Sequence, residues 1–344
     1  MTRTANLVIM VAVAGLILGI GVVAMPRPPK LSDRVSGDAA LITAVRRELG
    51  SGTHDRLAVA VIDNGRARSA LFGATEDTTF ELGSVTKTFT GDLLAIAIKR
   101  GEVTVDTKLG ELLDVGSGPV ADITLGQLAT QSSGLPRLPV GLSETSRVVL
   151  ASLRAGDPYA IDQQTLIDQA RHAEVSKKRY LYSNFGFALL GAALASAAGV
   201  DYPTLVAQRI TGPMALHHTR PATAADRPFG YTASGRRSAN WSMAGYAGAV
   251  GLRSTLPDMI NYVRAEADKS APGAAATTPI ADAGGQRIGY AWTTTGDITW
   301  HNGQTGGFSS FIGFDRSHRR AVVVLSNTSV PVDGLAIDLL GEDA

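Results

Sequence analysis

The chain of 344 residues contains no cysteine and few charged or aromatic side chains. The absence of cysteine excludes disulfide bonds, thiolate metal ligands and a cysteine nucleophile. Charged residues make up 18% of the chain, and 32 basic against 31 acidic side chains leave a formal net charge of +1. Because there is neither a basic excess nor a block of like charges, we expect no nucleic-acid partner.

Two kinds of catalytic motif are also missing. The six histidines have no spacing that would place two of them on one face of a helix as metal ligands. We therefore expect no metal and no other cofactor. A Gly-x-Ser-x-Gly segment is absent as well, which argues against an α/β-hydrolase with a Ser-His-Asp triad.

The chain begins with a long apolar segment. Residues 7–25 carry no charged or strongly polar side chain, and a helix of that length spans about 28 Å, close to the hydrocarbon thickness of a bilayer. We expect a single-pass membrane anchor, and a cleaved signal peptide with its cut near Ala24 is the alternative. Basic residues occur on both sides of the segment, so they do not fix its orientation. Residues 1–35 thus form the anchor and a proline-rich linker, and residues 36–344 form one domain.

The two ends of that domain have the patterns of strands, and its middle has the pattern of helices. Strands are predicted at 57–62, at a run ending near 72, and at 290–295, 298–303, 308–315 and 319–326. Helices are predicted at 38–49, 85–100, 125–130, 165–172, 185–198 and 202–208. The pattern predicts an α/β fold of the α+β type, with an antiparallel β-sheet from both chain ends, flanking helices and an inserted all-helical lobe.

A serine and a lysine stand one helical turn apart near the start of a predicted helix. Ser84 opens the helix and Lys87 follows three residues later, so both side chains lie on one face. The amino terminus of a helix also presents free N–H groups to an anion, as a developing oxyanion would need. The alternative interpretation is that Ser84 only caps the helix.

Two further segments carry polar side chains beside glycines or helix starts. Tyr182-Ser183-Asn184 precedes an apolar helix, and its alternative interpretation is a loop with a helix cap. The segment 301–307 is rich in glycine and lies on and just after a predicted strand. Its alternative interpretation is a turn with a surface histidine.

In this order the three segments resemble the motifs of the penicillin-recognising serine enzymes, and their flanks resemble class C β-lactamases and related DD-peptidases. The resemblance covers most of residues 56–330. Its further markers are the segments 123–125, 133–136, 250–258 and 305–308. It implies a β-lactamase/transpeptidase-like fold and catalysis through an acyl-enzyme.

The resemblance also implies roles for individual residues. Ser84 is the nucleophile, and Lys87 and Tyr182 transfer its proton, with the choice of base left open. Asn184 orients Lys87 and binds substrate. The backbone N–H groups of Ser84 and Gln304 form the oxyanion hole.

The third motif departs from the lysine that most β-lactamases have. Here it reads His301-Asn302-Gly303, which the resemblance assigns to substrate binding. Lysine is fully charged at neutral pH, whereas histidine has an ordinary pKa of about 6.5 and is mostly neutral. We therefore expect binding of a substrate carboxylate to be weaker or pH-dependent.

The motifs together favour a D-alanyl-D-alanine carboxypeptidase-type enzyme with its catalytic domain on the extracytoplasmic side, where peptidoglycan and β-lactams occur. The alternatives are a class C-like β-lactamase and an esterase of the same superfamily. A sensor of β-lactams or peptidoglycan that stalls after acylation is the alternative without turnover. The substrate, a β-lactam, a D-Ala-D-Ala peptide or an ester, is not fixed by the motifs.

Overall fold

The computed structural model describes residues 28–49, 52–139, 142–242 and 244–341. The predicted membrane segment 7–25, with its alternative cleavage site, lies outside the described residues. The catalytic motifs all lie within them.

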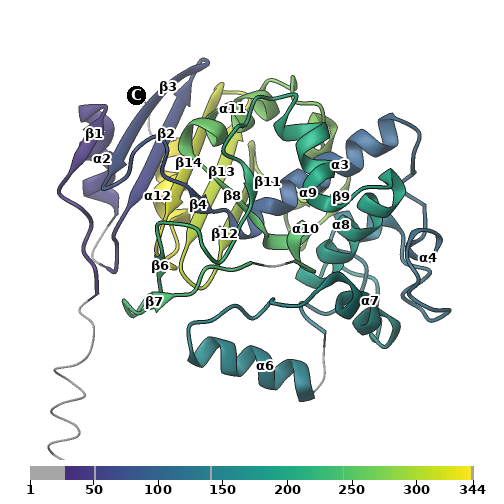
Figure 1. The fold of residues 1–344 in the computed structure, drawn as a ribbon. Coiled ribbons are helices and arrows are strands. Elements are labelled where there is room, and N and C mark those ends of the chain that lie inside the picture. Colours follow the sequence, from purple (N-terminus) through teal and green to yellow (C-terminus); the bar gives the residue numbers. More distant parts are fainter. Residues whose placement is uncertain (1–27, 50–51, 140–141, 243, 342–344) are drawn as a thin grey trace, which may run out of the picture.

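A nine-stranded sheet, antiparallel at every pairing, runs through the centre of the molecule in the order β1-β3-β2-β14-β13-β12-β11-β10-β9 (Figure 1). Strand β2, from the first part of the domain, pairs with β14, from the last part. The predicted sheet from both chain ends is therefore confirmed. Its strands are β1 (Val35–Gly37), β2 (Leu57–Asp63), β3 (Arg66–Phe72), β9 (Ala281–Asp282), β10 (Arg287–Ile288), β11 (Thr293–Thr295), β12 (Ile298–Gln304), β13 (Ser309–Asp315) and β14 (Arg320–Ser326).

An Asn-Gly turn, the dipeptide typical of tight hairpins, joins β2 to β3. Asn64 and Gly65 have φ angles of 49° and 81°, the left-handed values that a two-residue turn between antiparallel strands requires. Strands β1, β9 and β10 were not predicted, because each is only two or three residues long and too short for an alternating pattern.

The sheet is buried on both faces. Along β2, Ala58 and Ala60 contribute to the larger core cluster, and Leu57, Val59 and Val61 contribute to the smaller one. The smaller cluster is closed by the first and last helices of the domain, α2 (Ala39–Glu48) and α12 (Asp333–Gly341). The larger cluster continues from the sheet into the helical lobe. This explains why β2 and β14 are nearly continuous apolar runs and why every residue of β13 is buried.

The helices of the middle region form the predicted lobe on one side of the sheet (Figure 1). Helix α8 is at its centre, and most of its residues are buried. The helices are α3 (Thr86–Lys99), α4 (Leu109–Leu112), α5 (Leu125–Ala129), α6 (Leu142–Leu153), α7 (Gln163–Arg171), α8 (Asn184–Ala198), α9 (Tyr202–Val206), α10 (Ala247–Val250) and α11 (Leu256–Ala267), with short helical turns η1 (Gly83–Val85), η2 (Ala207–Thr211) and η3 (Ala274–Thr277).

Several short strands lie outside the main sheet, and one of them, β4 (Phe80–Glu81), lies just before η1. In the described chain they are β4, β5 (Arg220–Pro221) and β8 (Leu252–Ser254), which form one small sheet, and the hairpin β6 (Gly230–Tyr231) and β7 (Arg237–Ser238). Because β4 pairs with β8, the residues just before η1 are held in place by a segment from far along the chain.

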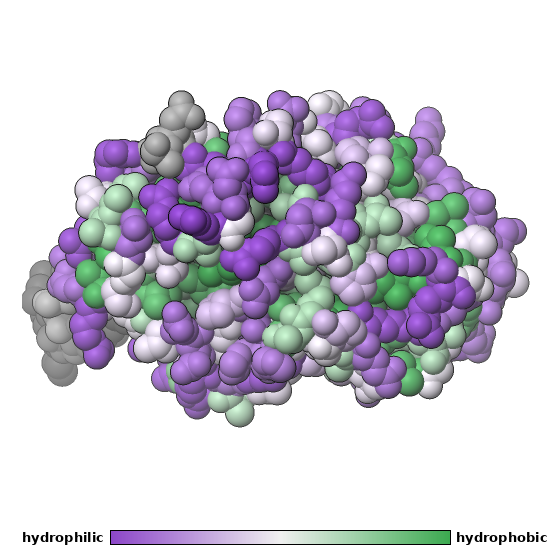
Figure 2. Space-filling view, turned by 90° about the horizontal axis from the view of Figure 1, so that it is seen from above, coloured by the Kyte–Doolittle hydropathy of each residue, from purple (hydrophilic) through white to green (hydrophobic). Residues whose placement is uncertain are grey.

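Figure 2, which views the molecule of Figure 1 from above, shows polar residues over most of this face, with apolar residues in smaller groups between them. Within the part of the chain that the structure describes, no single helix has both the length and the hydrophobicity to cross a bilayer. A bent pair of helices, Asn184–Ala198 with Tyr202–Thr211, meets both criteria when the two are taken together.

Candidate active site

Ser84 and Lys87 meet where η1 runs into α3. The Lys87 Nζ lies 3.0 Å from the Ser84 Oγ. Neither η1 nor α3 has a side-chain cap, so Ser84 does not serve as a helix cap. Ser84 retains 9% of its accessible surface, whereas Lys87 is fully buried. The Ser84 hydroxyl is therefore accessible from solvent, and the Lys87 amine lies buried behind it.

Lys87 has two further partners, both of them oxygen acceptors. Its Nζ donates to the Asn184 Oδ1 at 2.7 Å and to the Ala249 carbonyl oxygen at 2.8 Å. Burial holds the pKa of Lys87 well below its usual value, and the nearby Arg137 guanidinium lowers it further. A neutral amine has two N–H donors and one lone pair. The two donors match the two oxygens, and the lone pair is left for the Ser84 hydroxyl.

The Tyr182-Ser183-Asn184 segment brings Tyr182 to the same place. The Ser183 Oγ accepts a hydrogen bond from the Gly186 N–H at 2.8 Å and so caps α8, which fixes the residues on either side of it. The Lys87 Nζ lies 4.9 Å from the centroid of the Tyr182 ring. Burial raises the pKa of Tyr182, although its hydrogen bond with Ser84 opposes the rise. The phenol is therefore a proton donor at neutral pH.

Two glycines let the end of β12 approach η1. Gly83 has a φ of +51°, and a Cβ there would lie 2.8 Å from the Gln304 nitrogen. A Cβ on Gly303 would lie 2.0 Å from the Leu82 carbonyl oxygen. Both contacts are closer than real Cβ atoms tolerate. Ser84 and Gln304, whose N–H groups are the predicted oxyanion hole, line one cavity as a result.

His301 lies behind the cavity rather than on its wall. The side chain is 5% exposed, its Nδ1 donates to the Asn302 carbonyl oxygen at 2.6 Å, and its ring centroid is 6.4 Å from that of Tyr182. Burial lowers the pKa of His301 to about 3, and the Lys87 amine contributes to this shift when it is protonated. His301 is thus neutral in the usual pH range, so the pH-dependent carboxylate binding expected of it does not follow from this geometry.

The cavity lined by Ser84, the candidate catalytic cavity, measures about 430 Å³. The predicted site residues that line it are Ser84, Tyr182, Asn184, Asn302 and Gln304. The Asn302 Nδ2 also donates to the Asp333 Oδ1. The other three predicted residues, Lys87, His301 and Gly303, are not among the described residues that line this cavity.

Three charged or aromatic side chains that line the cavity were missed by the sequence analysis: Arg137, Tyr159 and Trp241. Arg137 is exposed and its guanidinium carbon lies 5.5 Å from the Tyr182 ring centroid. The Tyr159 hydroxyl accepts a hydrogen bond from the Asn184 Nδ2 at 2.7 Å, and its ring contacts Trp241 edge-on at 5.2 Å. Arg137 directly follows the marker segment 133–136 and could have been found from it. Tyr159 and Trp241 come from loops that carry no motif.

Glu81 lies behind this wall and joins two parts of it. Its Oε1 accepts from the Trp241 N–H at 3.0 Å, and its side chain is hydrogen-bonded to Thr305. The buried Arg253 guanidinium is 3.9 Å from it. Burial raises the pKa of Glu81 to about 7, although the hydrogen bonds and Arg253 oppose the rise. Glu81 is therefore a positioning residue shared by the segment after β12 and the Trp241 loop.

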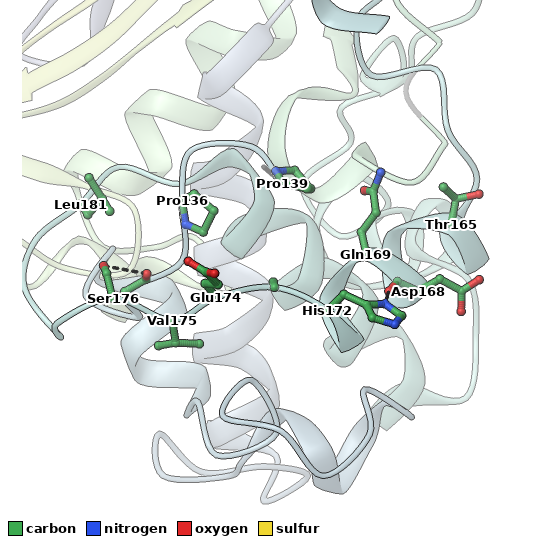
Figure 3. A pocket seen from close by; sticks show the side chains of 12 residues that line it. Pro136, Pro139, Thr165, Asp168, Gln169, His172, Glu174, Val175, Ser176 and Leu181 are labelled. Atoms are coloured by element: carbon green, nitrogen blue, oxygen red, sulfur yellow. Dashed lines mark hydrogen bonds between the residues drawn. The ribbon is translucent and has the colours of Figure 1, made fainter. Parts of the chain in front are cut away.

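A larger cavity of about 830 Å³ lies beside the catalytic one. Figure 3 shows Pro136, Glu174 and Leu181 on one side of it and the α7 residues Thr165 and Gln169 on the other. Arg137 and Tyr182, the neighbours of Pro136 and Leu181 in the chain, line the catalytic cavity, so the same two segments contribute to both cavities. None of the predicted catalytic residues is among the described residues that line the larger cavity.

Known proteins match both the sequence and the fold. The sequence model of the beta-lactamase family matches residues 42–343. The chain is 25% identical over 333 residues to a beta-lactamase of Pseudomonas fluorescens, with 80% of this chain and 89% of the relative covered. It is 27% identical over 230 residues to the D-alanyl-D-alanine-carboxypeptidase/endopeptidase AmpH of Escherichia coli K12, with 62% of this chain and 58% of the relative covered.

Two solved structures have the same fold. A class C beta lactamase from Rhodobacter sphaeroides superimposes with a TM-score of 0.74 and 22% identity, covering 88% of this chain and 98% of that one. A beta-lactamase/D-alanine carboxypeptidase from Pseudomonas syringae superimposes with a TM-score of 0.74 and 18% identity, covering 88% and 97%. The order of the motifs, the fold and the family match agree: the chain belongs to the beta-lactamase family of serine hydrolases.

Proposed function

We propose that this hydrolase forms an acyl-enzyme on Ser84 and acts as a carboxypeptidase on peptides that end in D-alanyl-D-alanine. The observation that carries the proposal is the set of partners around the Lys87 Nζ: two carbonyl oxygens and one hydroxyl. A protonated lysine would donate to all three. A neutral one, favoured by burial, can accept the proton of Ser84.

Acylation follows from these positions. The Ser84 hydroxyl gives its proton to the Lys87 Nζ while its Oγ bonds to the carbonyl carbon of the substrate. The oxyanion then faces the backbone N–H groups of Ser84 and Gln304. When the C–N bond breaks, the leaving amine takes the Tyr182 hydroxyl proton, and the extra proton on Lys87 restores the phenol.

Deacylation uses the same groups in reverse. No carboxylate is among the described residues that line the catalytic cavity. The proton of a water molecule that attacks the acyl carbon can pass to the neutral Lys87 amine, directly or through the Tyr182 hydroxyl, and the Ser84 oxygen then leaves with that proton.

Arg137 supports a substrate with a terminal carboxylate. It is the cationic side chain among the described residues that line the cavity, whereas His301, the counterpart of the usual lysine, is buried and neutral. A guanidinium stays charged at every relevant pH and can bind a carboxylate through two hydrogen bonds. The E. coli relative named as a D-alanyl-D-alanine-carboxypeptidase/endopeptidase is consistent with such a substrate.

Beta-lactam hydrolysis is the second candidate. The P. fluorescens relative is a named beta-lactamase, and a β-lactam presents a carboxylate and a strained amide to the same groups. An esterase would need no carboxylate site, so Arg137 weighs against that alternative. A stalled sensor would acylate in the same way and differ only in deacylation.

The experiment incubates the purified protein with a fluorescent penicillin and follows its intact mass, with Ser84→Ala as the matched control. We expect a label on wild type that persists, and release of D-alanine from a peptide ending in D-Ala-D-Ala. A label that is quickly lost while the drug is consumed would instead identify a β-lactamase. A persistent label without release of D-alanine would favour a sensor, and a wild type that behaves like Ser84→Ala would exclude the acyl-enzyme.

We further propose that residues 7–25 anchor the chain in the cell membrane with the catalytic domain outside. The uninterrupted apolar composition of this segment supports the proposal, and so does a substrate found in the cell wall. Secretion after cleavage near Ala24 is the alternative. The amino-terminal sequence of the protein isolated from membranes distinguishes the two, since only the anchor retains residues 1–24.

A further inference from the structure

Helix α6 has an exposed apolar face. Val149, Leu150 and Leu153 follow the i, i+1, i+4 spacing, so their side chains lie within about 100° of one another around the helix axis. They are 52%, 46% and 67% exposed. We call these three residues the α6 face. The other exposed large apolar side chains of the described residues, Val35, Val105, Ile280 and Ile337, do not share a helix with one another.

The α6 face lies beside the point where the described chain begins. A Cβ on Gly235, in the turn between β6 and β7, would lie 2.5 Å from the Pro28 Cα, so Pro28 packs directly on that turn. The next residue of the turn, Arg236, donates from its Nη2 to the Leu153 carbonyl oxygen at 3.0 Å. One hairpin therefore contacts both the end of α6 and a residue that closely follows the apolar amino-terminal segment. Figure 1 shows α6, β6 and β7 along the same lower edge of the molecule.

The charges at this edge are mostly positive. Arg154 directly follows α6 and is exposed, as is Arg236 on the neighbouring turn. Lys30 is exposed two residues after Pro28, and Asp33 is an exposed acid of the same stretch. Apolar side chains rimmed by long basic ones fit a lipid interface, because the basic groups reach the headgroups while the apolar groups enter the acyl boundary.

We propose that the α6 face docks into an anionic lipid bilayer and holds the catalytic domain against the membrane. This inference rests on the anchor proposed above, because the anchor places the α6 face close to the lipid. A stable protein–protein interface uses about 20 residues on each side, many more than the three apolar side chains of the α6 face. A tethered surface needs much less contact, since the anchor makes docking an intramolecular event.

The test uses the full chain, which lacks cysteine, so that one introduced cysteine carries one environment-sensitive dye. The variants are Leu150→Cys, Leu153→Cys and Ile337→Cys, the last being the matched control on α12, where Ile337 is 49% exposed. Each labelled protein is reconstituted in vesicles of phosphatidylglycerol and phosphatidylethanolamine that carry a quencher on the acyl chain.

We expect quenching and a blue shift of the dye at 150 and 153, and neither at 337. The effect should be reduced in vesicles of phosphatidylcholine alone. A Val149→Cys label combined with Leu150→Glu and Leu153→Glu should lose the quenching that Val149→Cys alone shows. Solvent-like emission at 150 and 153 would overturn the proposal. Energy transfer between labelled copies without lipid quenching would overturn it in favour of self-association.

A label at Leu16→Cys and a fluorescent penicillin of a second colour separate the possible failures. Quenching at 16 but not at 150 or 153 leaves the anchor standing and removes the docking. Labelling of Ser84 in the same vesicles reports on the hydrolase independently of either membrane contact.

Discussion

One group of residues in the catalytic site comes from regular elements, and another comes from loops. Ser84, Lys87, Asn184 and Gln304 stand on η1, α3, α8 and β12, which are rooted in the main core. Arg137, Tyr159 and Trp241 come from loops that reach the cavity from three parts of the chain. In the proposed mechanism the first group carries the bond chemistry together with Tyr182, which lies two residues before α8, and the second group determines what can enter. Chemistry that needs fixed distances is thus built on the rigid part of the molecule.

The largest effect is expected at Ser84, the proposed nucleophile. Ser84→Ala removes the hydroxyl that lies 3.0 Å from the Lys87 Nζ and should lower turnover by roughly 10³-fold or more. Intact mass should show no covalent label with a fluorescent penicillin. Because the alanine fits the same backbone, the melting temperature should stay close to that of wild type, and a large drop would assign Ser84 a structural role.

The next effect tests the neutral state of Lys87. Asn184→Asp places a carboxylate where the Oδ1 now lies, 2.7 Å from the Nζ, and so favours the charged amine. Acylation at pH 7 should fall by about 10²-fold and recover as pH rises. Tyr159→Phe is the control, because it removes the other partner of Asn184 without adding charge. An Asn184→Asp profile that keeps the wild-type shape would contradict Lys87 as the base.

A smaller effect is expected at the loop wall. Arg137→Met should raise KM by about 10-fold, or about 1.4 kcal/mol, for a peptide with a free terminal carboxylate. The same peptide with a terminal amide should be affected little, and Arg137→Lys should restore part of the loss. Because Arg137 also lowers the pKa of Lys87, the acylation profile should move slightly to higher pH. An equal rise in KM for the peptide acid and the peptide amide would show that Arg137 does not bind the carboxylate.

The smallest effect is expected at Glu81, which contacts both Trp241 and Thr305 behind the cavity. Burial raises the pKa of Glu81 from 4.5 to about 7, so the folded protein holds a proton that the unfolded chain releases in that window. Stability should therefore fall as pH rises from about 4.5 to about 7, and Glu81→Gln should reduce this slope. It should not abolish the slope, because burial also raises the pKa of Asp92. Denaturant unfolding at several pH values measures this slope, and equal slopes for wild type and Glu81→Gln would contradict the raised pKa of Glu81.

The sequence was most informative where a residue type and its element coincide. The Asn64-Gly65 turn, the helix after Ser84 and the strand ending at Gln304 follow from local patterns that the core then fixes. Trp241 could not be assigned, because loop positions depend on distant contacts such as that between Glu81 and Trp241. The state of His301 could not be foreseen either, since its pKa depends on burial that no local pattern encodes.

The contact between β12 and η1 can form only late in biosynthesis, because β12 comes near the end of the chain. Gly83 and Gly303 are 220 residues apart in the chain, and the close approach at these two glycines brings Ser84, the proposed nucleophile, to Gln304, which supplies half of the predicted oxyanion hole. Strand β2 gains its partner β14 only once residue 326 has been made. A chain still being synthesised thus carries its reactive serine without the groups that would let it acylate. The hydrolase becomes competent late, after nearly the whole domain has been produced.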